Sequence, residues 1–338
     1  MNKDTYYGRM RNFLSHHVHS ADELWMHAIR QLMDNGISRS SRVGAMTEVL
    51  GFSCTLTEIE SNFIYNTHRA LDPTYAAAEF VWYMSGERSG DIIKAYAPSY
   101  VKFLDDDGSA YGAYGARWQE QLTHLIHLLT TASDTRQAVL TCWDWGMHAD
   151  LYHAAGASKK DLPCTLALQF FVRDGCLHLI TTMRSNDAWL GMPYDVFCFT
   201  TLQMVIASMI GLDTGTYTHQ VGSLHVYEKD RARLYHAYLS PIGPPSFQLH
   251  VTREMRRCTS LDELKRLVNA ERLARTEHLF SDAFFIQDDS EQDLLTAIYC
   301  LCARRWATDD SARAIVERGI PPSLLEAART FEARKAKQ

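Results

Sequence analysis

The sequence predicts an α+β fold in which helices cover a sheet. Three patterns support this: a strand–turn–strand pattern near the middle of the chain, a long apolar helix pattern directly after it, and amphipathic helix patterns beyond residue 250. The chain has 338 residues, of which 46% are hydrophobic and 22% charged, so it can bury a large core. Disordered and fibrous classes are therefore excluded.

The first expected helix spans residues 20–35. It begins with the capping box Ser20-x-x-Glu23, in which two side chains can accept from the free backbone N–H groups of the first turn, and it ends at Gly36. Its apolar residues recur at helical spacing: Leu24, Ile29 and Leu32.

A second helix is expected over residues 72–86. This segment is apolar on almost every side except at Glu79, which predicts a helix inside the core that carries one carboxylate. Because burying a charge is costly, Glu79 requires a functional reason.

The middle of the chain changes to a period of two. Residues 165–173 and 176–183 are expected strands, and Asp174-Gly175 between them favours a two-residue hairpin turn with positive φ. Residues 194–210 then form an apolar helix that must lie against the sheet, and residues 216–227 resemble another strand.

The last ninety residues are expected to be mainly helical. Two further capping boxes, Ser260-x-x-Glu263 and Ser323-x-x-Glu326, open amphipathic patterns there.

Composition excludes several classes of function. With 34 Lys and Arg against 40 Asp and Glu, the net charge of −6 argues against duplex nucleic acid as a general partner. The polar start of the chain and the lack of any run of about 18 apolar residues predict neither a secretory signal nor a membrane span, so we expect a cytoplasmic protein. The eight cysteines form no CxxC pair, which argues against disulfides and zinc ribbons.

Common catalytic motifs are also absent. We find no glycine-rich phosphate loop, HExxH, Gly-x-Ser-x-Gly or zinc-deaminase spacing. The histidines at 16, 17 and 19 could bind a metal, but an exposed tail is the favoured interpretation, and His148 and His153 are treated in the same way. We therefore predict no metal site.

The strongest candidate for chemistry is Cys164. It directly precedes an expected strand, and Pro163 restricts the backbone before it. A lone cysteine of this kind is usually a small buried apolar residue. However, residues 183–195 form a dense polar segment that a core does not need, and an arginine there could stabilise a thiolate or bind a phosphate. His225 and Tyr227 add polar groups on one face of a strand.

Several motifs together resemble the thymidylate synthase family, in the order in which that family carries them. They are Arg42-x-Gly44, Glu79 before Trp82-Tyr83-x-x-Gly86, Tyr114-Gly115-x-x-Trp118, Pro163-Cys164, Arg184-Ser185-x-Asp187 with Gly191-x-Pro193, and Gly222-x-x-His225-x-Tyr227. The resemblance covers about residues 42–227, and segments 183–187 and 221–227 look most like phage deoxycytidylate hydroxymethylases. It implies a mixed sheet covered by helices, a catalytic domain over residues 1–247 and a mainly helical extension over 248–338.

The resemblance implies a role for each matching residue. Cys164 would add to C6 of a pyrimidine nucleoside monophosphate, and 5,10-methylenetetrahydrofolate would donate one carbon to C5. The implied catalytic residues are Cys164, Glu79, Asp195 and Tyr114. Arg42, Arg184 and Ser185 would bind the phosphate, together with Arg136 from the second subunit of a homodimer. His225 and Tyr227 would bind the sugar 3′-hydroxyl, and Asp187 the base or the folate. The implied folate-binding residues are Tyr100, Trp82, Asp187 and Gly191.

Departures from the family pattern indicate the substrate. Thymidylate synthases carry asparagine where this chain has Asp195, and a carboxyl group suits the 4-amino group and N3 of cytosine better than uracil. Alternatively, Asp195 is only an acid at a helix N-terminus. Thr165 replaces a histidine after the cysteine, and Gln137 replaces an arginine, which weakens the phosphate site by one charge.

A further departure concerns the product. Tyr100 stands where synthases place tryptophan, and a smaller hydroxylated ring would give water access to the intermediate, so that a 5-hydroxymethyl product forms. Tyr100 is alternatively an ordinary core aromatic. The resemblance fits dCMP and CMP alike. The alternatives are a dCMP 5-methyltransferase, a synthase acting on dUMP and a non-catalytic nucleotide-binding relative.

Overall fold

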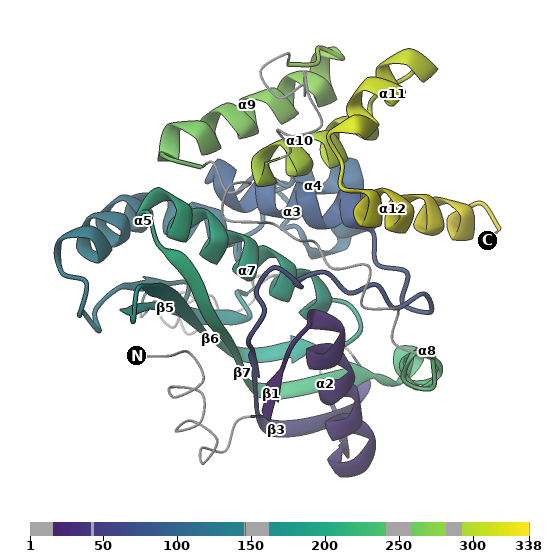
Figure 1. Ribbon diagram of the computed structural model, residues 1–338. Helices are drawn as coiled ribbons and strands as arrows, with labels where there is room; N and C mark the ends of the chain where they lie inside the picture. The colour runs from purple at the N-terminus through teal and green to yellow at the C-terminus, as the bar shows by residue number, and fades with distance from the viewer. Residues whose placement is uncertain are drawn as a thin grey trace.

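A computed structural model describes residues 16–41, 44–144, 146, 162–240, 258–281 and 293–337. They form a mixed sheet covered by helices (Figure 1), which confirms the predicted α+β fold. The strands are β1 (His16–Val18), β2 (Ile37–Ser40), β3 (Ala45–Leu56), β4 (Val139–Thr141), β5 (Thr165–Arg173), β6 (Cys176–Asp187) and β7 (Asp213–Tyr227). They lie in the order β1-β3-β7-β6-β5-β4, with β2 beside β3. The β1–β3 and β6–β7 pairs are parallel, and the others are antiparallel.

The predicted hairpin is confirmed at the turn between β5 and β6. Asp174 and Gly175 have φ angles of 51° and 78°, as a two-residue hairpin turn requires. However, β6 extends to Asp187, beyond the predicted end at 183, because its polar residues 184–187 continue to pair with β7. The first part of the polar segment that the sequence singled out, residues 183–187, is therefore fixed on a central strand.

The three predicted apolar or capped helices of the first 250 residues are also present. In α2 (Ala21–Asn35), the Ser20 hydroxyl accepts from the backbone N–H of Glu23 at 3.2 Å. In α3 (Pro73–Ser85), Asp72 caps the first turn and Pro73 occupies its first position. α7 (Met192–Met209) is buried on almost every side, because it packs between the strands β6 and β7 and the helix α3.

The remaining helices surround this centre. They are α4 (Asp91–Tyr96), α5 (Tyr114–Thr131), α8 (Glu228–Tyr238), α9 (Leu261–Glu277), α10 (Leu294–Arg304), α11 (Asp310–Arg318) and α12 (Pro322–Lys335), with the 3₁₀ helix η1 (Pro98–Phe103). In Figure 1, α9 to α12 lie beyond α3 and α4, on the side away from the sheet. None of the helices in the described part of the chain is long and apolar enough to cross a membrane.

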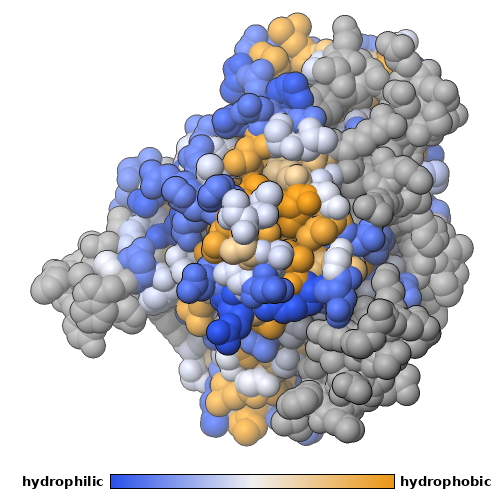
Figure 2. All heavy atoms as spheres, turned by 60° about the vertical axis from the view of Figure 1, so that its left-hand side comes forward, coloured by the Kyte–Doolittle hydropathy of each residue, from blue (hydrophilic) through white to orange (hydrophobic). Residues whose placement is uncertain are grey.

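The two faces of the sheet differ. Residues that point toward the helices are buried, whereas the alternate positions of β5, β6 and β7 are only partly buried. The partly buried set includes Gln169, Phe171, Ile180, Thr182 and Thr218. On the side of the molecule seen in Figure 2, apolar residues gather in the middle of the surface with hydrophilic residues around them.

Two local predictions were wrong. His16 and His17 do not lie in a free tail: they belong to β1, opposite Cys54 and Thr55 of β3, because Val18 after them is buried in the core. Ser323 does not cap a helix either. α12 begins at Pro322, and the Ser323 hydroxyl accepts from the Tyr65 hydroxyl at 3.1 Å.

Candidate active site

Cys164 lies beside the arginine that the sequence paired with it. Nη2 of Arg184 and Oγ of Ser185 are each 3.7 Å from the Cys164 sulfur. The same guanidinium donates to the carbonyl oxygens of Leu162 at 3.1 Å and Pro163 at 3.0 Å, so it fixes the turn that carries the cysteine. A cationic donor and a hydroxyl at the sulfur both favour the thiolate, which is the nucleophilic form.

Tyr114 joins this group from the first turn of α5. Its hydroxyl accepts from the backbone N–H of Thr165, the residue after the cysteine, at 3.3 Å. Its ring packs against Trp118 and Phe199, and burial raises its pKa well above the ordinary value. Tyr114 therefore stays protonated next to the nucleophile.

Glu79 and Asp195 form a pair of buried carboxyl groups between α3 and α7. Burial raises the pKa of Glu79 to about 8, and the neighbouring charge of Asp195 adds to the increase. Hydrogen bonds from the Tyr75 hydroxyl, at 3.2 Å, and the Cys198 thiol, at 3.9 Å, oppose it. Burial also raises the pKa of Asp195 to about 7. Near neutral pH the pair therefore retains a proton that it can donate.

A buried hydrogen-bonded chain ends at Asp195. Asn186 donates from Nδ2 to Oδ2 of Asp195 at 2.7 Å, and its Oδ1 contacts Nε2 of His219 at 2.9 Å. The other ring nitrogen of His219 contacts the Tyr217 hydroxyl at 2.7 Å. Burial lowers the pKa of His219 to about 3, so this histidine is neutral. Because Nδ2 of Asn186 donates to Asp195, its Oδ1 can only accept, and Nε2 of His219 carries the ring proton.

Sequence reasoning did not identify the roles of Tyr217, His219 and Asn186. Tyr217 and His219 are fully buried polar side chains on alternate, inward positions of one strand. That pattern was the available signal, since buried polar groups need partners.

The residues expected at the sugar, His225 and Tyr227, lie at the end of β7, beside Asp187 at the end of β6. Asp187 is opposite His225 in the parallel register of β6 and β7, and the His225 ring packs edge-on against Tyr227 at 5.1 Å. Oδ1 of Asp187 accepts from the backbone N–H groups of Trp189 and Leu190 at 2.8 and 3.1 Å. Asp187 thus shapes the turn that leads into α7.

Two glycines of the motifs allow close approaches. A Cβ on Gly222 would lie 2.9 Å from the carbonyl oxygen of Arg184, so a side chain there would displace the strand that holds the arginine. A Cβ on Gly191 would lie 3.3 Å from Nδ2 of Asn186 and 3.4 Å from Oδ2 of Asp195, the two atoms of one hydrogen bond. Gly191 therefore keeps space beside the Asp195 carboxyl group.

A cavity of about 490 Å³ opens next to the carboxyl pair. Its lining includes four predicted residues, Glu79, Tyr100, Gly191 and Asp195, and others that were not predicted, among them Arg69, Lys102, Tyr194, Phe331 and Lys335. Trp82 lies behind this lining: it is 3% exposed, packs edge-on against Tyr100 at 5.6 Å and donates to the Ser89 carbonyl.

Another predicted phosphate ligand, Arg136, lies away from Cys164 of the same chain. Arg136 is exposed in the turn before β4, where its carbonyl accepts from the Gln169 side chain at 2.9 Å, in the middle of β5 rather than at its Cys164 end. Arg42 is outside the described residues, as are His148 and His153. Within the described part of the chain, no group of three or more His, Cys, Asp and Glu residues could hold a metal ion.

The chain was compared with models of protein families. The model described as thymidylate synthase matches residues 23–266, which is well over half of the chain and includes every site residue described above except Phe331 and Lys335.

Proposed function

Because the chain belongs to the thymidylate synthase family, whose members transfer one carbon from 5,10-methylenetetrahydrofolate to C5 of a pyrimidine nucleoside monophosphate, we propose that it hydroxymethylates C5 of dCMP or CMP. The observation that carries the proposal is Asp195. It is a buried carboxyl group with a raised pKa, in the first turn of α7, at the position of the family's asparagine.

The hydrogen bonds of Asp195 favour cytosine over uracil. With Oδ2 accepting from Asn186, a proton on the carboxyl group resides on Oδ1. Oδ1 can then donate to the unprotonated N3 of cytosine, while the second lone pair of Oδ2 accepts from its 4-amino group. Uracil presents the opposite pattern, a donor at N3 and an acceptor at O4, and would leave two buried groups mismatched.

The nucleophile and the phosphate site belong to one structural unit. The Cys164 thiolate would attack C6 of the ring, and the electrons of the C5–C6 double bond would move toward C5, which then bonds to the donated carbon. Arg184 and Ser185 would bind the 5′-phosphate with Arg42 and with Arg136 of the partner subunit. His225 and Tyr227 would hold the sugar.

The cavity fits the donor. Its lining combines aromatic side chains, which include Tyr100, Phe103 and Tyr194, with cationic groups and the carboxyl pair. When bound, the folate supplies the carbon at the oxidation level of formaldehyde. Asp187, Gly191 and Tyr100 would position the donor, with Trp82 supporting Tyr100 from behind, while Glu79 would move protons through ordered water.

Tyr100 supports the hydroxymethyl product. It lines the cavity that Glu79 also lines, so a water at the reacting carbon would lie within reach of a proton-accepting group. The larger ring that synthases carry at this position would occupy more of that space.

The decisive experiment measures release of the labelled C5 hydrogen from dCMP, CMP and dUMP, with and without methylenetetrahydrofolate. We expect donor-dependent release from a cytosine nucleotide and a product that is 30 Da heavier, with tetrahydrofolate as the second product. A gain of 14 Da with dihydrofolate would identify a methyltransferase, and preferred turnover of dUMP would identify a thymidylate synthase. Nucleotide binding without hydrogen release would indicate a non-catalytic relative.

A further inference from the structure

The C-terminal helix α12 contributes to the wall of the donor cavity. Phe331 and Lys335 line the same cavity as Glu79 and Asp195. The family match ends at residue 266, so these two residues come from a part of the chain that the family model does not cover.

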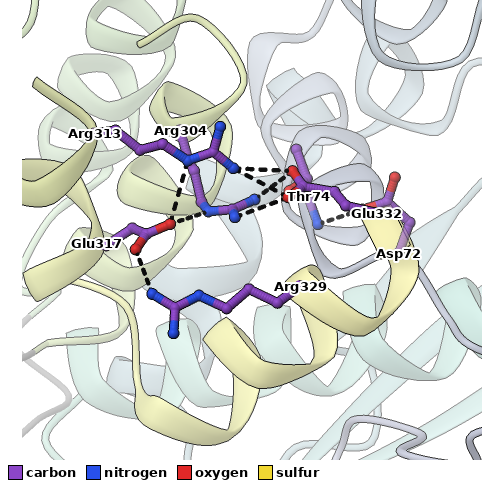
Figure 3. Close-up of polar contacts among 7 residues, drawn as sticks. All are labelled: Asp72, Thr74, Arg304, Arg313, Glu317, Arg329 and Glu332. Atoms are coloured by element: carbon purple, nitrogen blue, oxygen red, sulfur yellow. Dashed lines mark hydrogen bonds and ion pairs between the residues drawn. The ribbon is translucent and has the colours of Figure 1, made fainter. Parts of the chain in front are cut away.

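A buried arginine holds α12 in this place. Arg304 at the end of α10 is 3% exposed and donates to Oε1 of Glu317 at 2.8 Å. It also donates to both carboxylate oxygens of Glu332, on α12, at 2.6 and 3.0 Å. Figure 3 shows how Arg313 and Arg329 close the cluster around the same two glutamates. A two-pronged contact of this kind fixes direction as well as distance, so the position of α12 is well defined.

Two contacts tie α12 to the catalytic domain as well. Ser323 accepts from the Tyr65 hydroxyl, and Arg334 donates to the carbonyl oxygen of His68. Phe331 and Lys335 are therefore presented to the cavity by a helix that is anchored near both of its ends.

The cavity lining carries both acids and cations. Glu79 and Asp195 line the cavity together with one other acid, Asp72, and with three cations, Arg69, Lys102 and Lys335. Asp72 is already bound to the first turn of α3, and Arg69 stacks on Trp189 and Tyr194. Arg69 also donates to the Trp189 carbonyl at 3.0 Å, whereas Lys102 only lies over the Phe103 ring at 4.8 Å. Among the described residues, neither Lys102 nor Lys335 has an ion pair, which favours an anionic group on the ligand.

We propose that α12 completes the donor site: Lys335 and Lys102 bind the carboxylates of the folate's glutamate portion, and Phe331 supplies an apolar wall. The proposal rests on the family's donor, which also underlies the proposed function. It gives the C-terminal region a direct part in binding the second substrate.

The test removes the charge from the protein and from the ligand in turn. Binding of tetrahydrofolate and of tetrahydropteroate, which lacks the glutamate, is measured by calorimetry with saturating dCMP, CMP or dUMP. For Lys335→Gln and for Lys102→Gln we expect tetrahydrofolate to bind about three- to tenfold more weakly and tetrahydropteroate to bind within about twofold of wild type. Phe331→Ala should weaken both ligands, because an apolar wall does not distinguish them.

Lys337→Gln is the matched control. It removes the same charge two residues after Lys335, at a position that does not line the cavity. Equal losses for the two ligands, or an equal loss in the control, would overturn the proposal. Because binding is measured without turnover, a protein that meets these expectations but does not hydroxymethylate cytosine would contradict the proposed function alone.

Discussion

The Cys164 sulfur has two donors within 3.7 Å, on side chains that would also hold the phosphate. Cys164→Ser keeps both donors but replaces the thiolate by a poor nucleophile. We therefore expect turnover to fall by about 10⁴-fold or more, with the nucleotide dissociation constant within about threefold of wild type. Hydrogen release and equilibrium binding measure the two quantities. Cys176→Ser, at the other partly buried cysteine, should retain activity. Activity of Cys164→Ser within tenfold of wild type would exclude the covalent route.

Asp195 can be tested by the smallest possible change. Asp195→Asn supplies an amide that donates to O4 and accepts from N3–H, so it should gain turnover of dUMP and lose turnover of the cytosine nucleotide. We expect the ratio of the two kcat/KM values to change by about tenfold or more, measured at one pH. An unchanged ratio would mean that Asp195 only stabilises the start of α7.

Glu79 makes stability depend on pH in a defined direction. Its pKa is about 8 in the native protein and 4.5 for an ordinary glutamate, so between these values the native state holds a proton that the unfolded chain releases. Stability is therefore lost as pH rises through this window. Glu79→Gln removes the dependence, and its Tm should rise relative to wild type from about pH 5 to pH 8. A Tm difference that stays constant with pH would show that Glu79 is ionised in the fold.

At the residue scale, the sequence identified groups that belong to recognisable motifs. The structure brings Cys164, Arg184, Ser185 and Tyr114 together at one end of β5. The sequence could not identify the role of His219, because the partner of a histidine inside a strand is known only when the neighbouring strand is known. Here the parallel pairing of β6 and β7 brings it to Asn186.

At the scale of elements, the ionic cluster of α10, α11 and α12 provides a test. Arg304 is 3% exposed and binds two glutamates, so Arg304→Met should lower the free energy of unfolding by about 1–3 kcal/mol, because Glu317 and Glu332 lose their most buried partner and keep only the more exposed Arg313 and Arg329. Arg329→Met is the comparison: its side chain is 61% exposed and should contribute about 0–1 kcal/mol. Urea denaturation measures both. Equal effects would show that burial does not strengthen the cluster.

Elements with strong local signals were predictable, and those formed by distant pairing were not. The hairpin at Asp174-Gly175 and the cap at Ser20 depend on neighbouring residues, and both are present. β3 was not predicted, because its sequence has no clear alternation and includes Gly51 with φ of 73°; it becomes a strand through its long antiparallel pairing with β7. Ser323 had the right spacing for a cap, but the helix starts at the adjacent proline.

At the scale of the whole molecule, members of this family are typically dimers, and the phosphate site is proposed to need an arginine from the partner. Arg136→Ala and Cys164→Ser should each be nearly inactive. A hybrid dimer has one site with a native cysteine and a native arginine. When an equal mixture of the two variants exchanges subunits, about half of the dimers become hybrids with one of their two sites intact. The mixture should therefore recover about a quarter of wild-type activity. Activity assays before and after exchange test this, with light scattering to confirm the dimer. No recovery would place Arg136 outside the partner's site.

The pairing of β3 has a consequence for synthesis. Residues 46–56 pair with residues 217–227, and no partner for this edge exists until the ribosome has made the second segment. At about 5–20 residues per second, the interval is on the order of ten seconds or more. During that time β3 presents a long unpaired edge to which other nascent chains could add a strand. The emergence of β7 ends this exposure, so the strand that carries His225 and Tyr227 to the site also protects the newly made chain from aggregation.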